Sequence, residues 1–390
     1  VSIERIEDMI EGITGDRIQN LRQKMKSASP EPDVDTFLVL IEENRRYLSG
    51  FTGEDGQYDE SAGALLISAD ACILATDSRY DTQARQECPG YEVHVYQKGL
   101  AKELPEILKR LKTRRLGFES RRLSYDGYSK IVEQLDQSGL SIELVPTLEM
   151  VETLRLIKDE SEIEAIRKAV HLAESAFTDL IQTELVPGAA ENHVAWELEK
   201  RMREAGAQSV SFPVITASGP NSALPHAIAG SRVFQSAEPL LFDWGARLDG
   251  YCSDMSRTVF LDPPDESLKK IYTTVYDAQQ KAIEAIRPGK TTCEIDAIAR
   301  SHIEEKGYKG CFGHGLGHGV GLAVHEAPSL SPITERDRTI SENMVFTVEP
   351  GIYIPDKGGV RLENMVVVRS HGAEVFNHLP IRMDMTGTWT

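Results

Sequence analysis

Residues 187–206 read PGAAENHVAWELEKRMREAG, and the same pattern returns 101 residues later as PGKTTCEIDAIARSHIEEKG at 288–307. Each copy opens with Pro-Gly, continues with helical periodicity and ends at a glycine. The apolar positions also coincide, namely Val194, Leu198 and Met202 in the first copy and Ile295, Ala299 and Ile303 in the second. This repetition predicts an internal duplication, with two helix–helix–sheet halves that face each other.

Each predicted half continues into strands that carry two carboxylates. These are Asp243 and Asp254 in the first half, and Glu349 and Glu363 in the second. A cleft between duplicated halves would receive ligands from both.

The segment LLFDWGARLDGYCSD at 240–254 predicts a β-hairpin. Asp249-Gly250 is the preferred dipeptide of a two-residue type I′ turn, which pairs Leu248 with Tyr251 and places Asp243 and Asp254 on one face. Carboxylates this close repel each other unless a cation lies between them. A solvated hairpin with a polar outer face is the plain alternative, although Leu240–Phe242 and Trp244 favour a half-buried strand.

A second cluster, GHGLGHGVG at 313–321, runs on to Val324-His325-Glu326. Histidines 314 and 318 have helical ligand spacing, but five glycines in nine positions would destroy a helix. As a strand, the segment puts His314, Leu316, His318 and Val320 on one face and the glycines on the other. Such a glycine face admits another backbone or a substrate. A glycine-rich surface loop is the alternative.

The third cluster consists of the strand end MVFTVEPG at 344–351 and RLEN at 361–364. A carboxylate at the end of an apolar strand is costly without a partner. For Glu363 that partner could simply be Arg361 in a salt bridge. Taken together, four carboxylates and an imidazole without thiolates suit Mn²⁺, Co²⁺, Fe²⁺ or Zn²⁺. Five ligands are too many for one open catalytic zinc, but suit two ions with bridging carboxylates.

The first 150 residues alternate short strands with helices, which predicts an α/β layer domain. Strands are expected at 36–41, 64–67, 71–75 and 116–118, and helices at 104–111 and 125–135. A long amphipathic helix is expected before Pro187. The predicted domains are therefore 1–153 and 154–390, in an α/β (α+β) chain.

The composition of the chain argues against a nucleic-acid-binding protein, a membrane-spanning protein and a secreted protein. A net charge of −18 argues against binding to nucleic acid. The five cysteines are scattered and never spaced as CxxC, which is typical of reduced thiols. No apolar run is long enough to span a bilayer, and the first residues contain no apolar segment of a secretory signal. A cytoplasmic location is expected.

These motifs resemble metallopeptidase family M24, which includes aminopeptidase P, proline dipeptidase and methionine aminopeptidase and has the pita-bread fold. The matching elements are the Asp243/Asp254 hairpin, HGLGHGVGLAVHE (314–326), TVEPGIY (347–353) and VRLEN (360–364). Upstream, RRYLSGFTG (45–53) and TDSRYDTQA (76–84) resemble the creatinase-type N-terminal domain of the proline-directed branch.

The resemblance implies a role for each residue. Asp243 would hold one metal, Asp254 and Glu363 would bridge both, and His318 and Glu349 would hold the other. Glu349 would also shuttle a proton. Three histidines would contact substrate or the tetrahedral intermediate, and an arginine would orient the last ligand; these are His226, His314, His325 and Arg361. Manganese is the expected metal, with Co, Zn or Fe as alternatives, and a homodimer is expected.

The resemblance further implies an exopeptidase that acts on short peptides with proline at the second position. An Xaa-Pro aminopeptidase is expected rather than an Xaa-Pro dipeptidase, because no arginine closely follows His325. The dipeptidase is the alternative if Arg336 or Arg338, farther along the chain, folds back to the site. Two other hypotheses are a metal-free peptide-binding module and a creatinase-like hydrolase. The intact ligand set argues against both.

Overall fold

The computed structural model describes residues 3–26, 33–56 and 60–380. The chain divides into two compact units, Val1–Arg155 and Leu156–Thr390. Within the described ranges, no helix is both long and apolar enough to cross a membrane.

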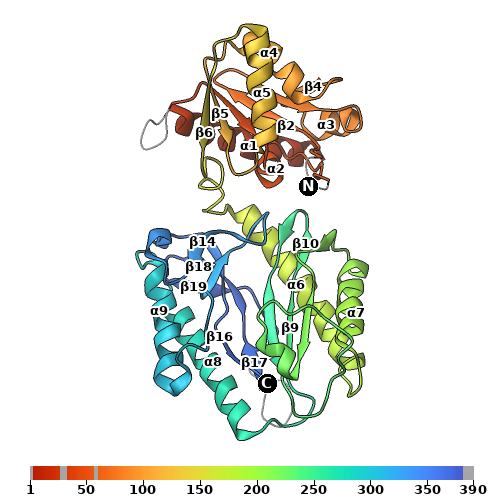
Figure 1. The fold of residues 1–390 in the computed structure, drawn as a ribbon, viewed down its shortest axis with the longest axis vertical. Helices are drawn as coiled ribbons and strands as arrows, with labels where there is room; N and C mark the ends of the chain where they lie inside the picture. Colours follow the sequence, from red (N-terminus) through yellow and green to blue (C-terminus); the bar gives the residue numbers. More distant parts are fainter. Residues whose placement is uncertain (1–2, 27–32, 57–59, 381–390) are drawn as a thin grey trace. The chain divides into compact units, whose positions relative to one another are not determined.

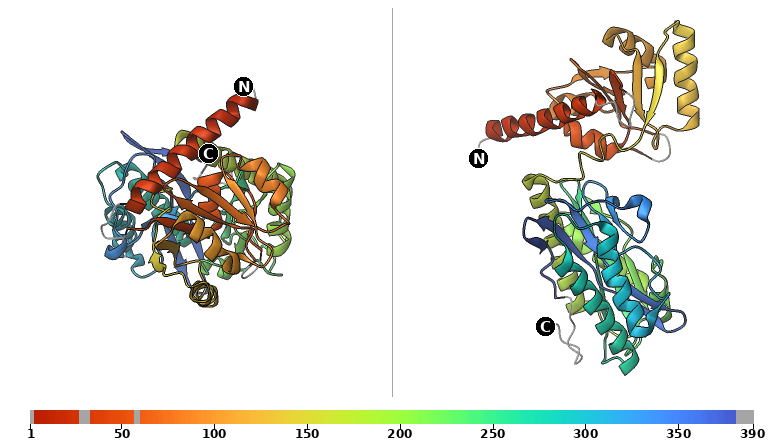
Figure 2. Two further views of the ribbon diagram at one scale, coloured as in Figure 1. Left: turned by 90° about the horizontal axis from the view of Figure 1, so that it is seen from above. Right: turned by 90° about the vertical axis from the view of Figure 1, so that its left-hand side faces the viewer.

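The first unit is a mixed six-stranded sheet in the order β4-β3-β2-β1-β5-β6. Its strands are β1 (Thr36–Val39), β2 (Ala64–Ser68), β3 (Cys72–Thr76), β4 (Glu92–Val95), β5 (Arg115–Glu119) and β6 (Glu143–Thr147). Its helices are α1 (Ile3–Lys26), α2 (Glu42–Ser49), α3 (Asp81–Glu87), α4 (Leu100–Leu111) and α5 (Tyr125–Ser138). Helices α1 and α5 lie on opposite sides of this sheet (Figure 2).

The core of the first unit confirms the α/β layer prediction. Apolar side chains of α4 and α5, among them Leu104, Leu108 and Ile131, pack against Leu38 and Leu116 of the sheet. Helix α4 begins at Leu100, four residues before the predicted start, and its first turn adds Leu100 and Ala101 to the residues packed against this core.

The second unit contains four long helices, α6 (Glu160–Thr183), α7 (Glu191–Glu204), α8 (Glu266–Ala285) and α9 (Thr292–Ile303). The strands of the first half are β7 (Ser209–Val210), β8 (Ile215–Ser218), β9 (Leu240–Trp244), β10 (Ala246–Leu248), β11 (Tyr251–Cys252) and β12 (Met255–Val259). Those of the second half are β13 (Gly317–Gly319), β14 (Glu326–Leu330), β15 (Val345–Val348), β16 (Gly351–Ile354), β17 (Gly358–Arg361), β18 (Asn364–Arg369) and β19 (Gly372–Val375).

These helices form two pairs. Helices α6 and α7 pack together near β8–β11, whereas α8 and α9 pack together near β14–β19 (Figure 1). One core of aromatic and aliphatic side chains, with Phe177 stacked on Trp244, joins both groups.

The predicted duplication is confirmed in detail by the two Pro-Gly segments. Gly188 and Gly289 have φ values of 90° and 91°, a left-handed conformation that favours glycine. Their amides donate to Phe234 O and Ile340 O, respectively, at 3.0 and 2.9 Å. The six apolar positions of α7 and α9 that match in sequence are all fully buried.

The hairpin at 240–254 has the predicted register. Leu248 pairs with Tyr251, and Asp243 pairs with Ser256. Asp249 and Gly250 have φ values of 50° and 81°, as a type I′ turn requires.

Candidate metal centre

A cavity of about 520 Å³ opens within the second unit. All nine predicted site residues line it, namely His226, Asp243, Asp254, His314, His318, His325, Glu349, Arg361 and Glu363. Residues that are 137 positions apart in the chain therefore share one site.

The four carboxylates occupy matching places in the two halves. Asp243 lies in β9 and Asp254 directly precedes β12, the strand that pairs with β9. Glu349 directly follows β15, and Glu363 directly precedes β18, which pairs with β15. Each half thus supplies two carboxylates from one antiparallel strand pair.

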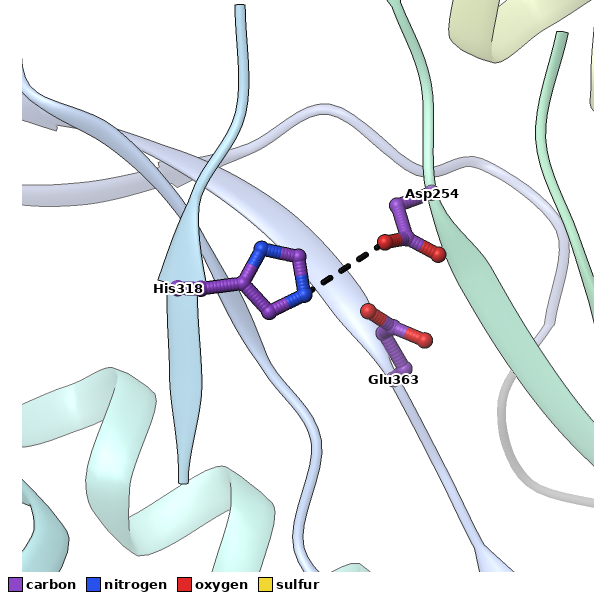
Figure 3. A group of neighbouring side chains, drawn as sticks. All are labelled: Asp254, His318 and Glu363. Atoms are coloured by element: carbon purple, nitrogen blue, oxygen red, sulfur yellow. Dashed lines mark ion pairs between the residues drawn. The ribbon is translucent and has the colours of Figure 1, made fainter. Parts of the chain in front are cut away.

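The imidazole of His318 reaches these carboxylates from β13 (Figure 3). Its Nε2 is 3.5 Å from Asp254 Oδ2 and 3.4 Å from Glu349 Oε1. One ligand atom each of Asp254, His318 and Glu363 lies within 4.8 Å of the others. This is the spacing of donors around a shared cation.

The backbone around His318 fixes how its ring is presented. Nδ1 is 3.1 Å from Gly319 O, and because a carbonyl only accepts, Nδ1 carries the proton. The Nε2 lone pair is then left facing the carboxylates, as a metal ligand requires. The His318 amide donates to Thr347 Oγ1 at 3.0 Å, and Thr347 Oγ1 donates to Glu349 Oε1 at 3.2 Å.

The strand predicted for 314–320 was too long. Only Gly317–Gly319 forms β13, and His314 lies before it, where its carbonyl accepts from Arg300 Nη2 at 2.7 Å. The glycine face does admit a neighbouring backbone. A Cβ at Gly317 would lie 2.0 Å from Thr347 O, and one at Gly319 would lie 2.1 Å from Ala327 O.

Burial disfavours the charged form of the carboxyl groups of this site in the absence of a cation. Burial and the nearby charges of Glu363, Asp243 and Glu349 raise the pKa of Asp254 well above its ordinary value. Burial also raises the pKa of Glu363 strongly and that of Glu349 to about 8. Asp243 Oδ1 and Glu363 Oε1 are buried and have no hydrogen-bond partner among the described residues. Divalent cations would satisfy these oxygens and offset the repulsion, so the donor set fits such ions.

Burial favours the neutral state of His314 and His318. Burial lowers the pKa of both His314 and His318 to about 4. Neutral imidazole is the form that binds metals. His325 packs its ring 4.2 Å from that of His318, and His226 is exposed at the cavity.

Arg361 does not pair with Glu363, contrary to the salt bridge considered from the sequence. It donates through Nη2 to Asp243 Oδ2 at 2.6 Å and through Nε to Ser256 Oγ at 2.8 Å. Ser256 Oγ in turn donates to Glu363 Oε2 at 2.8 Å. Arg361 therefore contacts one carboxylate directly and reaches the last one through a hydroxyl.

Three contributing residues escaped the sequence analysis. Tyr353 OH lies 2.9 Å from His314 Nε2 and accepts from Arg361 Nη1 at 3.0 Å. Ser256 and Thr347 hold carboxylates as described above. All three lie one or two residues from a predicted ligand or inside a quoted motif. No sequence pattern, however, indicated that their hydroxyl groups contact site residues.

Two family models match the chain. Metallopeptidase family M24 matches residues 164–370, and the creatinase/prolidase N-terminal domain matches residues 17–157. An uncharacterized peptidase of Bacillus subtilis, YqhT, is 40% identical over 92% of this chain and 98% of its own.

Two solved structures are similar throughout. The Xaa-Pro dipeptidase from Bacillus anthracis has a TM-score of 0.88 at 39% identity, covering 95% of this chain and 99% of that one. The X-Pro aminopeptidase from Thermotoga maritima has a TM-score of 0.80 at 37% identity, covering 90% and 97%. With the duplicated fold and the converging carboxylates, these matches show that the chain belongs to metallopeptidase family M24, with a creatinase/prolidase N-terminal domain ahead of a pita-bread catalytic domain.

Proposed function

We propose that this protein is an exopeptidase with two divalent metal ions that hydrolyses the bond between an N-terminal residue and proline. One observation carries the proposal: four carboxylates and one imidazole converge on a single cavity, and two of their oxygens are buried without a hydrogen-bond partner in the described part of the chain. Asp243, Asp254, Glu363, His318 and Glu349 would hold the ions. When bound, the ions would lower the pKa of water and polarise the scissile carbonyl.

The remaining chemistry belongs to side chains of this chain. The carboxylate of Glu349 accepts a proton from the attacking water and returns it to the leaving amine. Thr347 orients this carboxylate by donating to Oε1. His226, His314 and His325 line the cavity, where His226 and His325 can donate to the carbonyl oxygen as negative charge develops on it. His314 carries its proton on Nδ1, which donates to Gly315 O at 2.8 Å, and its Nε2 accepts from Tyr353 OH at 2.9 Å.

The cavity walls fit a short peptide with proline in second position. Phe212, Pro213, Ile215, Ile228 and Ile333 supply apolar lining. A proline ring is apolar and lacks an amide N–H, so such walls can bind it without leaving a donor unpaired. Two similar structures are named as enzymes that act on X-Pro peptides.

Arg336 favours the dipeptidase over the aminopeptidase that the sequence led us to expect. It lies in the short helix η3 (Thr334–Arg336), and although it is 11 residues beyond His325, it lines the same cavity. A guanidinium there can pair with the free carboxylate that follows proline in a dipeptide. An aminopeptidase substrate continues past proline and has no carboxylate at this place.

The test is a panel of Ala-Pro, Ala-Pro-Ala and Ala-Ala, run after reconstitution with Mn²⁺, Co²⁺ and Zn²⁺ in turn. Preference for Ala-Pro, lost in Arg336→Ala but kept in Arg338→Ala, supports the dipeptidase; Arg338 does not line the cavity and is the matched control. Faster cleavage of Ala-Pro-Ala supports the aminopeptidase. Equal cleavage of Ala-Ala, or no cleavage with any metal, contradicts the proposed function.

The family resemblance supports three further parts of the proposal. Manganese is the proposed metal, a homodimer is the proposed assembly, and residues 1–153 and 154–390 are the proposed domains. A cytoplasmic location agrees with five cysteines that are all free thiols. Metal analysis of the purified protein and light scattering test the first two points.

A further inference from the structure

Lys158 is a buried cation for which the catalytic steps above have no use. It is only 2% exposed and lies between the start of the second unit and Asp159, the N-cap of α6. Its backbone amide donates to Asn343 O at 3.0 Å, which fixes the position of the residue. Lysine is almost never fully buried unless it is paired.

Its partner is Glu326, the residue after His325. Lys158 Nζ lies 2.7 Å from Glu326 Oε1, and the two side chains are 1% and 8% exposed. Two glycines of the His318 segment make room for this pair. A Cβ at Gly321 would lie 2.4 Å from Glu326 Oε1, and one at Gly319 would lie 2.9 Å from Glu326 O. The glycine face is thus occupied, in part, by this glutamate.

Glu326 is the first residue of β14, and His325 directly precedes this strand. The two neighbouring side chains lie in different surroundings. The glutamate side chain is buried against Lys158, whereas His325 lines the cavity, with its ring tilted against that of His318 and 4.2 Å between the ring centroids. Because the two residues share a peptide bond, an ion pair that fixes Glu326 also restrains the backbone that carries His325.

We propose that Lys158 and Glu326 are positioning residues for His325, holding its imidazole at the substrate cavity beside His318. The inference rests on the proposed function, in which His325 contacts the substrate. A role in stability alone is a weaker account, because apolar side chains of similar volume often replace a buried ion pair at no cost in stability. An ion pair is directional, so it can hold His325 in one orientation, whereas apolar packing is not directional.

A double-mutant cycle on Ala-Pro hydrolysis tests the proposal with Glu326→Gln, His325→Ala and the combined variant. Glu326→Gln keeps the shape and removes the charge. It should lower kcat/KM about 10-fold in the wild-type background, in the range seen when an outer partner of a site residue is lost. With His325 already removed, it should change kcat/KM less than about 2-fold, since the residue it positions is gone.

Equal losses in both backgrounds would overturn the inference, as would full activity of His325→Ala. Inactivity of the metal-loaded wild type would instead refute the proposed function, so the two failures are distinct. Thermal midpoints are recorded for every variant. If Glu326→Gln does not fold, Lys158→Arg takes its place, with the same non-additivity expected.

The matched control is Arg201→Gln in the same unit. Arg201 pairs with Glu184 and Glu197 at 3.1 and 2.8 Å, and none of these residues lines the cavity. This variant should leave kcat/KM unchanged in both backgrounds, and a loss equal to that of Glu326→Gln would also overturn the inference.

Discussion

Arg361 and Asp243 form the shortest charged contact of the site, with 2.6 Å between Nη2 and Oδ2. The arginine is 3% exposed and donates as well to Ser256 Oγ, Tyr353 OH and Pro225 O. A permanent positive charge therefore sits inside the carboxylate cluster and orients one of its members.

Arg361→Lys is expected to weaken metal binding about 10- to 100-fold, the usual effect of losing a partner that orients a ligand. Lysine keeps the charge but lacks the planar fork that serves Asp243, Ser256 and Tyr353 together. Competition with a chromophoric chelator measures the affinity. Unchanged affinity would show that charge alone suffices.

Tyr353→Phe removes a hydroxyl that contacts both His314 and Arg361. We expect kcat to fall about 5- to 10-fold, corresponding to roughly 1 kcal/mol for a lost hydrogen bond, with the fold intact because the ring remains buried. Steady-state kinetics and circular dichroism measure both quantities. A rise in KM with unchanged kcat would contradict this role.

Gly317→Ala should destabilise the second unit by about 1–3 kcal/mol and reduce metal binding, since the added methyl overpacks against β15. Its Cβ would lie 2.0 Å from Thr347 O, so β13 and His318 must shift. Denaturant unfolding and metal titration measure the two effects.

Gly313→Ala is the control for that variant, because no atom of the residues that the structure describes, other than those of its chain neighbours, lies within 4 Å of a Cβ at Gly313. It belongs to the same glycine-rich motif and should alter neither stability nor metal content. Similar losses in both variants would indicate a general need for glycine rather than a local clash.

The metal-free protein should lose stability as the pH rises from about 6.5 to 8. Glu349 has a folded pKa raised to about 8, so the folded state binds more protons than the unfolded state in this range, and stability falls with pH. His318, whose pKa is lowered to about 4, acts in the opposite direction only below its ordinary value near 6.5. Thermal midpoints across this range test the sign.

Added Mn²⁺ should reverse that trend, because cations bind the deprotonated carboxylates and stabilise the folded state more as the pH rises. A metal-free protein whose midpoint is constant from pH 6.5 to 8 would contradict the assigned burial of these groups.

Local chemistry explains which parts of the site were predictable. Asp249-Gly250 dictates its own turn, and the turn sets the register as far as Asp243 and Ser256. The matching Pro-Gly segments likewise impose the same backbone conformation at Gly188 and Gly289. In each case a few neighbouring residues determine the local backbone conformation.

What depended on distant contacts was missed. Tyr353 acts through His314 and Arg361, and no pattern near Tyr353 marks either contact. Whether Arg336 folds back to the cavity stayed open, because separation along the chain says little about where a loop folds. A salt bridge between Glu363 and its neighbour Arg361 was the plain alternative to metal binding, but Arg361 contacts Asp243, 118 residues away, instead.

The duplication bears on the origin of the site. Neither half contains all four of the carboxylates that line the site, since Asp243 and Asp254 come from one and Glu349 and Glu363 from the other. An ancestor made of a single half would have assembled the full set only by associating with a copy of itself around a twofold axis. After gene fusion the two copies could diverge in sequence. His318, which is supplied by the second half only, is one result of that divergence.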